Sequence, residues 1–318
     1  LLADGVSTGG LTKLGAGTLI ITNSGANNYR GGTVVGAGTL SVGNNIGETA
    51  AALGIGRVTV SNGATLHFKP GSTATSYNFT NAFLVNGGTL IGEDGIQRVA
   101  GNSTFTVGEL GANVQASWGG KDVYIDGAIS GNAGLNLAHG PTAGSAATIH
   151  IGSGASSYSG TVSVSGAGNG AILSLDTATG LQYAVVNLNP GTPGSMTVTP
   201  AGGATIAGLT GSGGTVRPAA VAGNYVLTVR TTNTFTYGGA LVNNTGVLGL
   251  RKLGSGTQIL SGASTATGNF TVDEGTLVLG ATGSVAGALV VGAGAVLDVS
   301  AKPTLTLGAG QALRGSGL

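Results

Sequence analysis

A short motif recurs along the whole chain: an apolar residue, a polar residue and a second apolar residue, with Gly, Ser or Asn close behind. Strict alternation over so few residues predicts a short β-strand with one buried face. Strands of this length are not stable as isolated hairpins, so we expect them to stack into one repetitive structure around a narrow core. The residues expected to face that core include Leu40, Val42, Leu135, Leu137, Leu277, Leu279, Leu305 and Leu307.

Composition favours a folded repeat over a disordered chain. Disorder requires low hydrophobicity and usually a high net charge, whereas 41% of the 318 residues are hydrophobic and the net charge is +1. The 64 glycines suit a fold with many tight corners. The absence of cysteine excludes disulfide bonds, cysteine-ligated zinc and thiol catalysis.

Sequences similar to Gly-Thr-Leu recur along the chain, and their spacing indicates the length of one repeat. The closing leucines stand at Leu19, Leu40, Leu66 and Leu90, and near the end of the chain at Leu277 and Leu297. A period of roughly 21 residues predicts an all-β β-solenoid of about 15 coils. We expect a single continuous segment over residues 1–318, with irregular corners or loops near 138–160 and 187–224. A stacked β-sandwich array, which uses equally short strands, is the alternative.

Two segments, residues 9–45 and residues 249–279, resemble the passenger-associated repeat of autotransporters. The first carries the repeat in Leu11, Lys13, Gly15, Gly17, Thr18, Leu19, Asn27, Tyr29, Gly31, Gly32, Thr33 and residues 37–40. The second keeps Leu250, Lys252, Gly254, Gly256 and Thr257, but has Gln258 in place of the usual Leu and Ala266 where Tyr is expected.

The resemblance implies a right-handed parallel β-helix that is extracellular or on the bacterial cell surface. No signal peptide opens the chain, and no apolar run of 18 or more residues occurs in it. We therefore expect a processed chain or a segment of a longer protein, with no membrane span in this segment.

Parallel β-helices also serve as polysaccharide-cleaving enzymes, which place clustered acids on one outward face. Alternation predicts that Asp122, Tyr124 and Asp126 point outward. Trp118 could stack on a sugar if it is exposed, but a packed core or turn residue is the favoured interpretation for it. We define these four residues as the candidate ligand-contact strip. A solvated strand is the favoured interpretation, so we predict no catalytic, cofactor-binding or metal-binding residues.

Two other ligand classes are excluded by the residues available. The three histidines have no spacing typical of a metal site. The 12 basic residues are scattered, which argues against nucleic-acid binding.

The sequence therefore predicts a structural surface module, a stalk or fibre-forming element that needs no cofactor and is not an enzyme. The alternatives are an adhesin that binds a glycan or a protein of a host or neighbouring cell, and a carbohydrate-active β-helix enzyme. The expected partner is a second copy of the chain, by end-to-end stacking of β-helix, or the remainder of a longer parent chain. A glycan or surface protein is the partner under the adhesin alternative.

Overall fold

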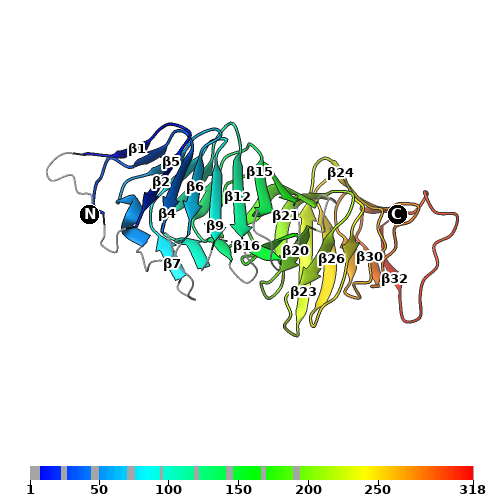
Figure 1. Ribbon diagram of the computed structural model, residues 1–318. Helices are drawn as coiled ribbons and strands as arrows, with labels where there is room; N and C mark the ends of the chain where they lie inside the picture. The colour runs from blue at the N-terminus through cyan, green and yellow to red at the C-terminus, as the bar shows by residue number, and fades with distance from the viewer. Residues whose placement is uncertain are drawn as a thin grey trace. The chain divides into compact units, whose positions relative to one another are not determined.

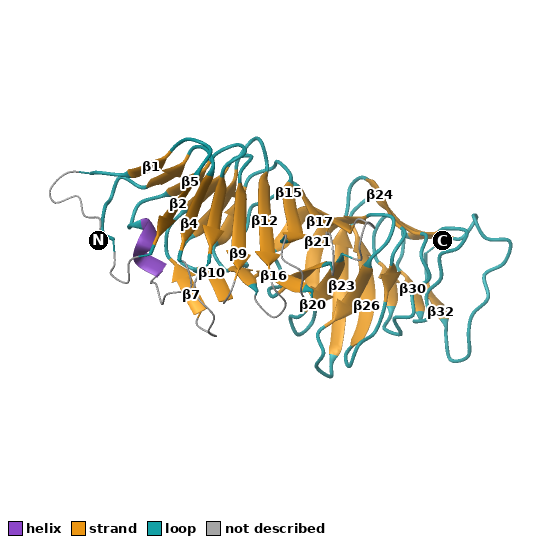
Figure 2. Ribbon diagram, viewed as in Figure 1, coloured by secondary structure: helices purple, strands orange, loops and turns teal. Residues whose placement is uncertain are grey.

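The computed structural model describes residues 8–22, 27–43, 50–69, 76–93, 96–117, 122–140, 146–165, 170–188 and 194–317. Nearly all regular structure in it is β-strand, and the one helical element in these ranges is the short 3-10 helix η1 (Ala50–Leu53) (Figure 2). The strand pairings are parallel throughout the described residues. The chain is thus an all-β parallel β-solenoid of about 12 turns, as its alternating motifs predict.

The chain divides into two compact units, which are described separately. The N-terminal unit comprises Leu1–Val162 and Gly166–Ala171, and the C-terminal unit comprises Ser163–Ser165 and Ile172–Leu318. Two strands, β17 (Thr161–Ser165) and β18 (Ala171–Leu175), cross the boundary along the chain.

Each coil of the N-terminal unit contributes strands to parallel stacks, as the order of labels along each stack in Figure 1 shows. One stack contains β1 (Leu11–Lys13), β3 (Thr33–Val35), β5 (Val58–Val60), β8 (Phe83–Val85), β11 (Thr104–Val107) and β14 (Ala128–Ser130). A second contains β2 (Thr18–Ile21), β4 (Thr39–Val42), β6 (Thr65–Phe68), β9 (Thr89–Glu93), β12 (Ala112–Ser117) and β15 (Leu135–His139). A third contains β7 (Ser76–Phe79), β10 (Ile96–Val99), β13 (Val123–Ile125) and β16 (Ala147–Ile151).

The C-terminal unit is built in the same way. Its longest stack contains β19 (Leu181–Leu188), β21 (Ala204–Thr210), β23 (Asn224–Arg230), β26 (Val247–Leu253), β28 (Phe270–Val272), β30 (Leu289–Val291) and β32 (Leu313–Gly315). A second contains β18 (Ala171–Leu175), β20 (Ser195–Val198), β22 (Thr215–Pro218) and β25 (Ala240–Leu241). A third contains β24 (Thr234–Tyr237), β27 (Thr257–Leu260), β29 (Thr276–Leu279) and β31 (Val296–Asp298).

The prediction of about 15 coils was too high, because most coils are longer than the period on which it was based. In the first stack Leu11 pairs with Thr33, Thr33 with Val58 and Val58 with Phe83, so each of these coils exceeds that period. The extra residues lie in the corners between strands, which vary in length without disturbing the ladders. About 12 turns result.

Alternation along the strands directs aliphatic side chains into the core, as predicted. Six of the eight residues expected there are buried: Leu40, Val42, Leu135, Leu137, Leu277 and Leu279. In the N-terminal unit a phenylalanine cluster widens the core, since Phe68 stacks on Phe79 at 4.2 Å between ring centroids and meets Phe83 edge-on at 6.5 Å. Burial of such apolar side chains supplies the main driving force for folding.

The prediction was wrong for Leu305 and Leu307. No strand forms between β31 and β32, and the Leu307 side chain is 39% exposed. Pro303, which lacks a backbone N–H for a strand ladder, interrupts the segment just before these leucines.

Both intervals expected to be irregular contain regular strands, and β16 (Ala147–Ile151) lies within the first of them, 138–160. Residues 152–160 contain no strand, and buried Tyr158 anchors this stretch through its hydroxyl, which lies 2.7 Å from the carbonyl oxygen of Ala133 and 3.0 Å from that of Thr161. The interval 187–224 contains the regular strands β20, β21 and β22.

Candidate functional site

The candidate ligand-contact strip lies on and beside β13. Val123 and Ile125 are buried, while Asp122, Tyr124 and Asp126 are partly exposed on the opposite face, as alternation predicts. Trp118 lies outside the described residues.

Tyr124 does not offer a free ring face to a ligand. The parallel register places Arg98 and His150 on either side of it, from the neighbouring strands β10 and β16. The Arg98 guanidinium lies 3.9 Å from the Tyr124 ring centroid, and the His150 imidazole stacks on the ring at 4.0 Å and 10°. Because both faces are covered, this tyrosine cannot stack on a sugar in this arrangement.

The two aspartates of the strip are also engaged within the protein. Asp126 forms an ion pair with Arg98, and the Asp122 carboxylate lies 3.5 Å from His150 Nε2 and accepts a hydrogen bond from the Thr148 N–H at 3.3 Å. Each charge therefore meets an opposite charge or a donor on an adjacent strand, the arrangement that stabilises a solvated sheet face.

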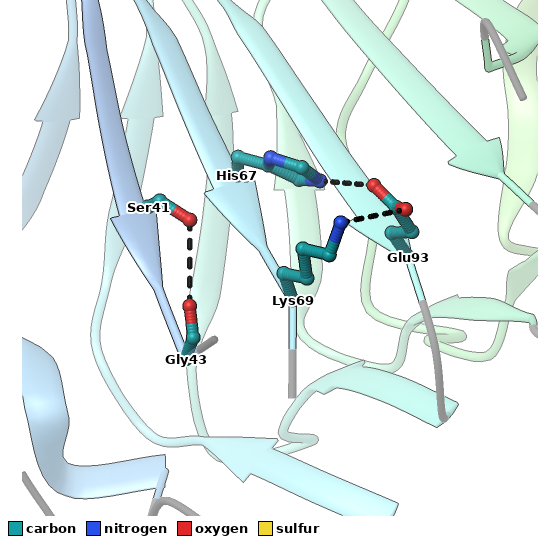
Figure 3. Close-up of polar contacts among 5 residues, drawn as sticks. All are labelled: Ser41, Gly43, His67, Lys69 and Glu93. Carbon is teal, nitrogen blue, oxygen red and sulfur yellow. Dashed lines mark hydrogen bonds and ion pairs between the residues drawn. The ribbon is translucent and has the colours of Figure 1, made fainter. Parts of the chain in front are cut away.

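A second polar cluster, which the sequence did not single out, lies across β6 and β9. The Glu93 carboxylate meets His67 Nε2 at 2.7 Å and Lys69 Nζ at 3.2 Å (Figure 3). The recurring Gly-Thr-Leu sequences could have predicted this contact, because aligning Leu66 with Leu90 places Lys69 beside Glu93. Glu93 is the last residue of β9.

This cluster contains the residue types of a nucleophilic triad without its geometry. Ser41 lies beside His67 in the register, yet its hydroxyl donates to the Gly43 carbonyl oxygen at 3.5 Å and points away from the imidazole in Figure 3. A triad requires the serine hydroxyl to donate to the histidine. The cluster is an ion-pair network in this structure. Within the described ranges, no group of three or more His, Cys, Asp or Glu side chains could hold a metal ion.

The strongest recurring arrangement is a corner built around a buried lysine. Lys13, at the end of β1, is 7% exposed. Its ammonium group donates to three backbone carbonyl oxygens, those of Leu14 at 3.0 Å, Gly15 at 2.7 Å and Ala37 at 3.0 Å. The first two belong to its own corner and the third to the next coil. All three donors of the ammonium are thus used, and the lysine joins two successive coils.

Lys252 repeats this arrangement in the C-terminal unit. It is fully buried, and its Nζ donates to the carbonyl oxygens of Leu253 at 2.9 Å, Gly254 at 2.7 Å and Glu274 at 3.1 Å. Burial lowers the pKa of Lys252 to about 8, and the negative charge of Glu274 partly opposes this effect. We call this arrangement the lysine corner.

Glycine is required at two positions of each lysine corner. Gly254 turns the chain after the lysine with φ +77°, and Gly275 of the following coil has φ +66°. A Cβ at Gly275 would lie 2.4 Å from the Gly254 carbonyl oxygen, which leaves no room for another residue. Gly15 and Gly38 play the same parts in the first copy, with φ +77° and +64°.

The turn of the second copy replaces a large residue with a small one. In the first copy Tyr29 is buried and shares a 2.6 Å hydrogen bond with Thr33. Ala266 and Phe270 occupy the equivalent positions, and both are fully buried. The aromatic ring is thus at the first of these two positions in the first copy and at the second position in the second copy. Each copy therefore keeps one ring in this part of its core.

Comparison with protein families identifies the lysine corner as part of a known repeat. The family described as passenger-associated-transport-repeat matches residues 11–42 and 250–279. A search of curated proteins and a search of solved structures each found no match. Two such repeats in a parallel β-solenoid fit a structural module of the autotransporter passenger type, a family that implies secreted or cell-surface exposure. No helix in the described ranges is both long enough and apolar enough to cross a membrane.

Proposed function

We propose that this chain, which carries two passenger-associated-transport repeats, is a structural stalk at the bacterial cell surface. The observation that carries the proposal is the lysine corner, which recurs in both units and joins one coil to the next through a buried cation. Such corners add side-chain links to the backbone ladders, so the stack of coils resists local unfolding. A stalk needs this property, because it is exposed to proteases and must hold a distal segment away from the cell.

The charged side chains of the polar clusters support a structural role over an enzymatic one. Asp126 pairs with Arg98, Glu93 with His67 and Lys69, and Asp273 with Arg251. Acid–base catalysis requires a carboxyl group within reach of substrate and poised to exchange a proton. We expect no turnover of polysaccharides, esters or peptides by the purified chain. Release of reducing sugar that is lost in an Asp122→Ala variant would contradict this expectation.

The stalk proposal can be tested on living cells. The full chain is placed between a surface anchor and an epitope tag, and a flexible Gly/Ser segment of equal length serves as the control. We expect antibody to label the tag on intact cells and external protease to leave the chain uncleaved under conditions that cut the control. Cleavage of the chain at the rate of the control would reject the proposal.

We further propose that additional β-coil stacks on the first coil of the N-terminal unit. Leu14, Leu19 and Ile20 lie on or beside the edge strands β1 and β2, with 71%, 38% and 47% of their surface exposed. Leu19 continues the row that is buried one coil later at Leu40. An apolar edge with free backbone groups favours pairing with another parallel strand.

The added coil belongs either to a longer parent chain or to a second copy of this one. Sedimentation of the isolated chain at micromolar concentration separates the two sources. Concentration-dependent fibres favour a second copy, and a stable monomer favours the parent chain. Pairing of either kind should weaken when Leu19→Glu and Ile20→Glu charge the edge, and an unchanged interaction would reject the proposal.

A further inference from the structure

The outer face of the C-terminal unit contains an open groove across β23, β26 and β28. Its volume is about 650 Å³, and its lining includes Asn224, Val226, Gly249, Arg251, Asn269 and Asp273. This size lies within the range of about 300–1,000 Å³ typical of small-ligand sites. The groove is distinct from the candidate ligand-contact strip, which lies on the N-terminal unit.

Gly249 lies in the lining of the groove, on the central strand β26. Leu248 and Leu250 point into the core, so position 249 faces outward, and the register places it next to Val226. A Cβ there would lie 2.7 Å from the Asn269 carbonyl oxygen, so the backbone of Asn269 approaches closely enough that only glycine fits at this position.

The rim carries donors and acceptors that the protein does not use fully. Arg251 Nε donates to Asp273 Oδ2 at 2.5 Å, and no described residue bonds the remaining N–H groups of Arg251 or Asp273 Oδ1. The side-chain amides of Asn224 and Asn269 are exposed and also have no hydrogen-bond partner among the described residues. Hydrogen-bond donors and acceptors that the protein does not use therefore surround the groove.

The chemistry of this lining selects against most ligand classes. Arg251 and Asp273 neutralise each other, so the groove has no net charge with which to attract an ion. An extended peptide cannot add a strand here, because β26 is already paired on both sides, with β23 and β28. A neutral ligand rich in hydroxyl groups fits best, since amides and a guanidinium–carboxylate pair bind vicinal hydroxyls by donating and accepting together.

We propose that the groove defined by Asn224, Gly249, Arg251, Asn269 and Asp273 binds a neutral glycan. The chain would then be an adhesive module as well as a stalk, and this second role does not depend on the first.

The test uses the full chain and a panel of immobilised neutral oligosaccharides containing glucose, galactose, mannose or N-acetylglucosamine, with sialylated and sulfated glycans alongside. We expect binding to at least one neutral glycan. Asn269→Ala and Arg251→Gln should each weaken it about tenfold, the loss of roughly one hydrogen bond. Arg98→Gln removes the comparable Arg–Asp pair of the N-terminal unit and should change affinity less than about twofold.

Three outcomes would overturn the proposal: no binding to any neutral glycan, binding confined to charged glycans, or equal affinity in all variants. Thermal unfolding of each variant separates a lost contact from a lost fold. Because Arg251 and Asn269 are exposed, both variants should unfold within a few degrees of the parent chain.

Discussion

Gln258 satisfies both backbone polar groups of Leu209, a residue on an earlier coil of the same unit. Its Oε1 accepts from the Leu209 N–H at 3.2 Å and its Nε2 donates to the Leu209 carbonyl oxygen at 2.9 Å. Gln258 is fully buried. Gln258 stands where the repeat usually has Leu, and this difference from the repeat supplies the side-chain amide that bonds the Leu209 backbone.

Replacing Gln258 with Leu should therefore destabilise the protein, although it restores the usual residue of the repeat. The Leu209 N–H and C=O would be left buried without this partner, at a cost of about 2–4 kcal/mol in free energy of unfolding. Urea unfolding measures the effect. Gln115→Leu, on an outward position of β12, is the matched control and should change stability by less than about 0.5 kcal/mol. An unchanged or raised stability in Gln258→Leu would show that the amide contacts contribute nothing.

Lys252→Met should lower the free energy of unfolding by about 2–4 kcal/mol, because it removes the donors for three carbonyl oxygens in a buried corner. Lys302→Met is the control, since partly exposed Lys302 donates a single bond, to the Ala281 carbonyl oxygen at 3.3 Å. It should cost less than about 0.5 kcal/mol. Equal unfolding midpoints for the two variants would contradict a structural role for the lysine corner.

Stability should rise with pH above neutrality. The pKa of Lys252 is about 8 in the folded protein and 10.5 in the unfolded chain, so between these values the unfolded state binds more protons. The free energy of unfolding should increase by about 1–2 kcal/mol from pH 7.5 to 9.5. Burial raises the pKa of Tyr158 and Tyr237, so their ionisation in the unfolded chain lowers stability only near pH 10 and above.

Urea unfolding at the two pH values measures this rise, and Lys252→Met is the control that should lack it. A rise of the same size in that variant would assign the effect to another group.

Gly275→Ala should destabilise the protein by about 2–4 kcal/mol. The φ of +66° is unfavourable for alanine, and its Cβ would collide with carbonyl oxygens of the preceding corner and approach Lys252 Nζ at 2.9 Å. Gly294→Ala separates the two effects, because Gly294 has φ +76° but no atom within 4 Å of a Cβ. It should cost only about 1–2 kcal/mol. Thermal unfolding of both variants gives the comparison, and similar losses would mean that the close contact does not matter.

Which side chains face the core and which face solvent can be predicted from the amino-acid sequence, because alternation along a short strand is a local property. Leu135 and Leu137 are buried and Asn136 points outward for this reason alone. The lysine corner could likewise be located in the sequence from the spacing of lysine and glycine in the two repeats, although its carbonyl contacts could not.

Which outward residues contact one another depends on how the coils stack in three dimensions. Successive coils differ in length, since one coil runs from Thr257 to its partner Thr276 and a longer one from Val58 to its partner Phe83, and the corners absorb the difference. Because the corners vary in length, alternation within one strand does not tell which residues of the adjacent coils lie beside Tyr124. The hydrogen bonds between Gln258 and Leu209 are even harder to predict from the sequence. They skip an intervening strand, and they depend on which backbone groups the fold leaves without a partner.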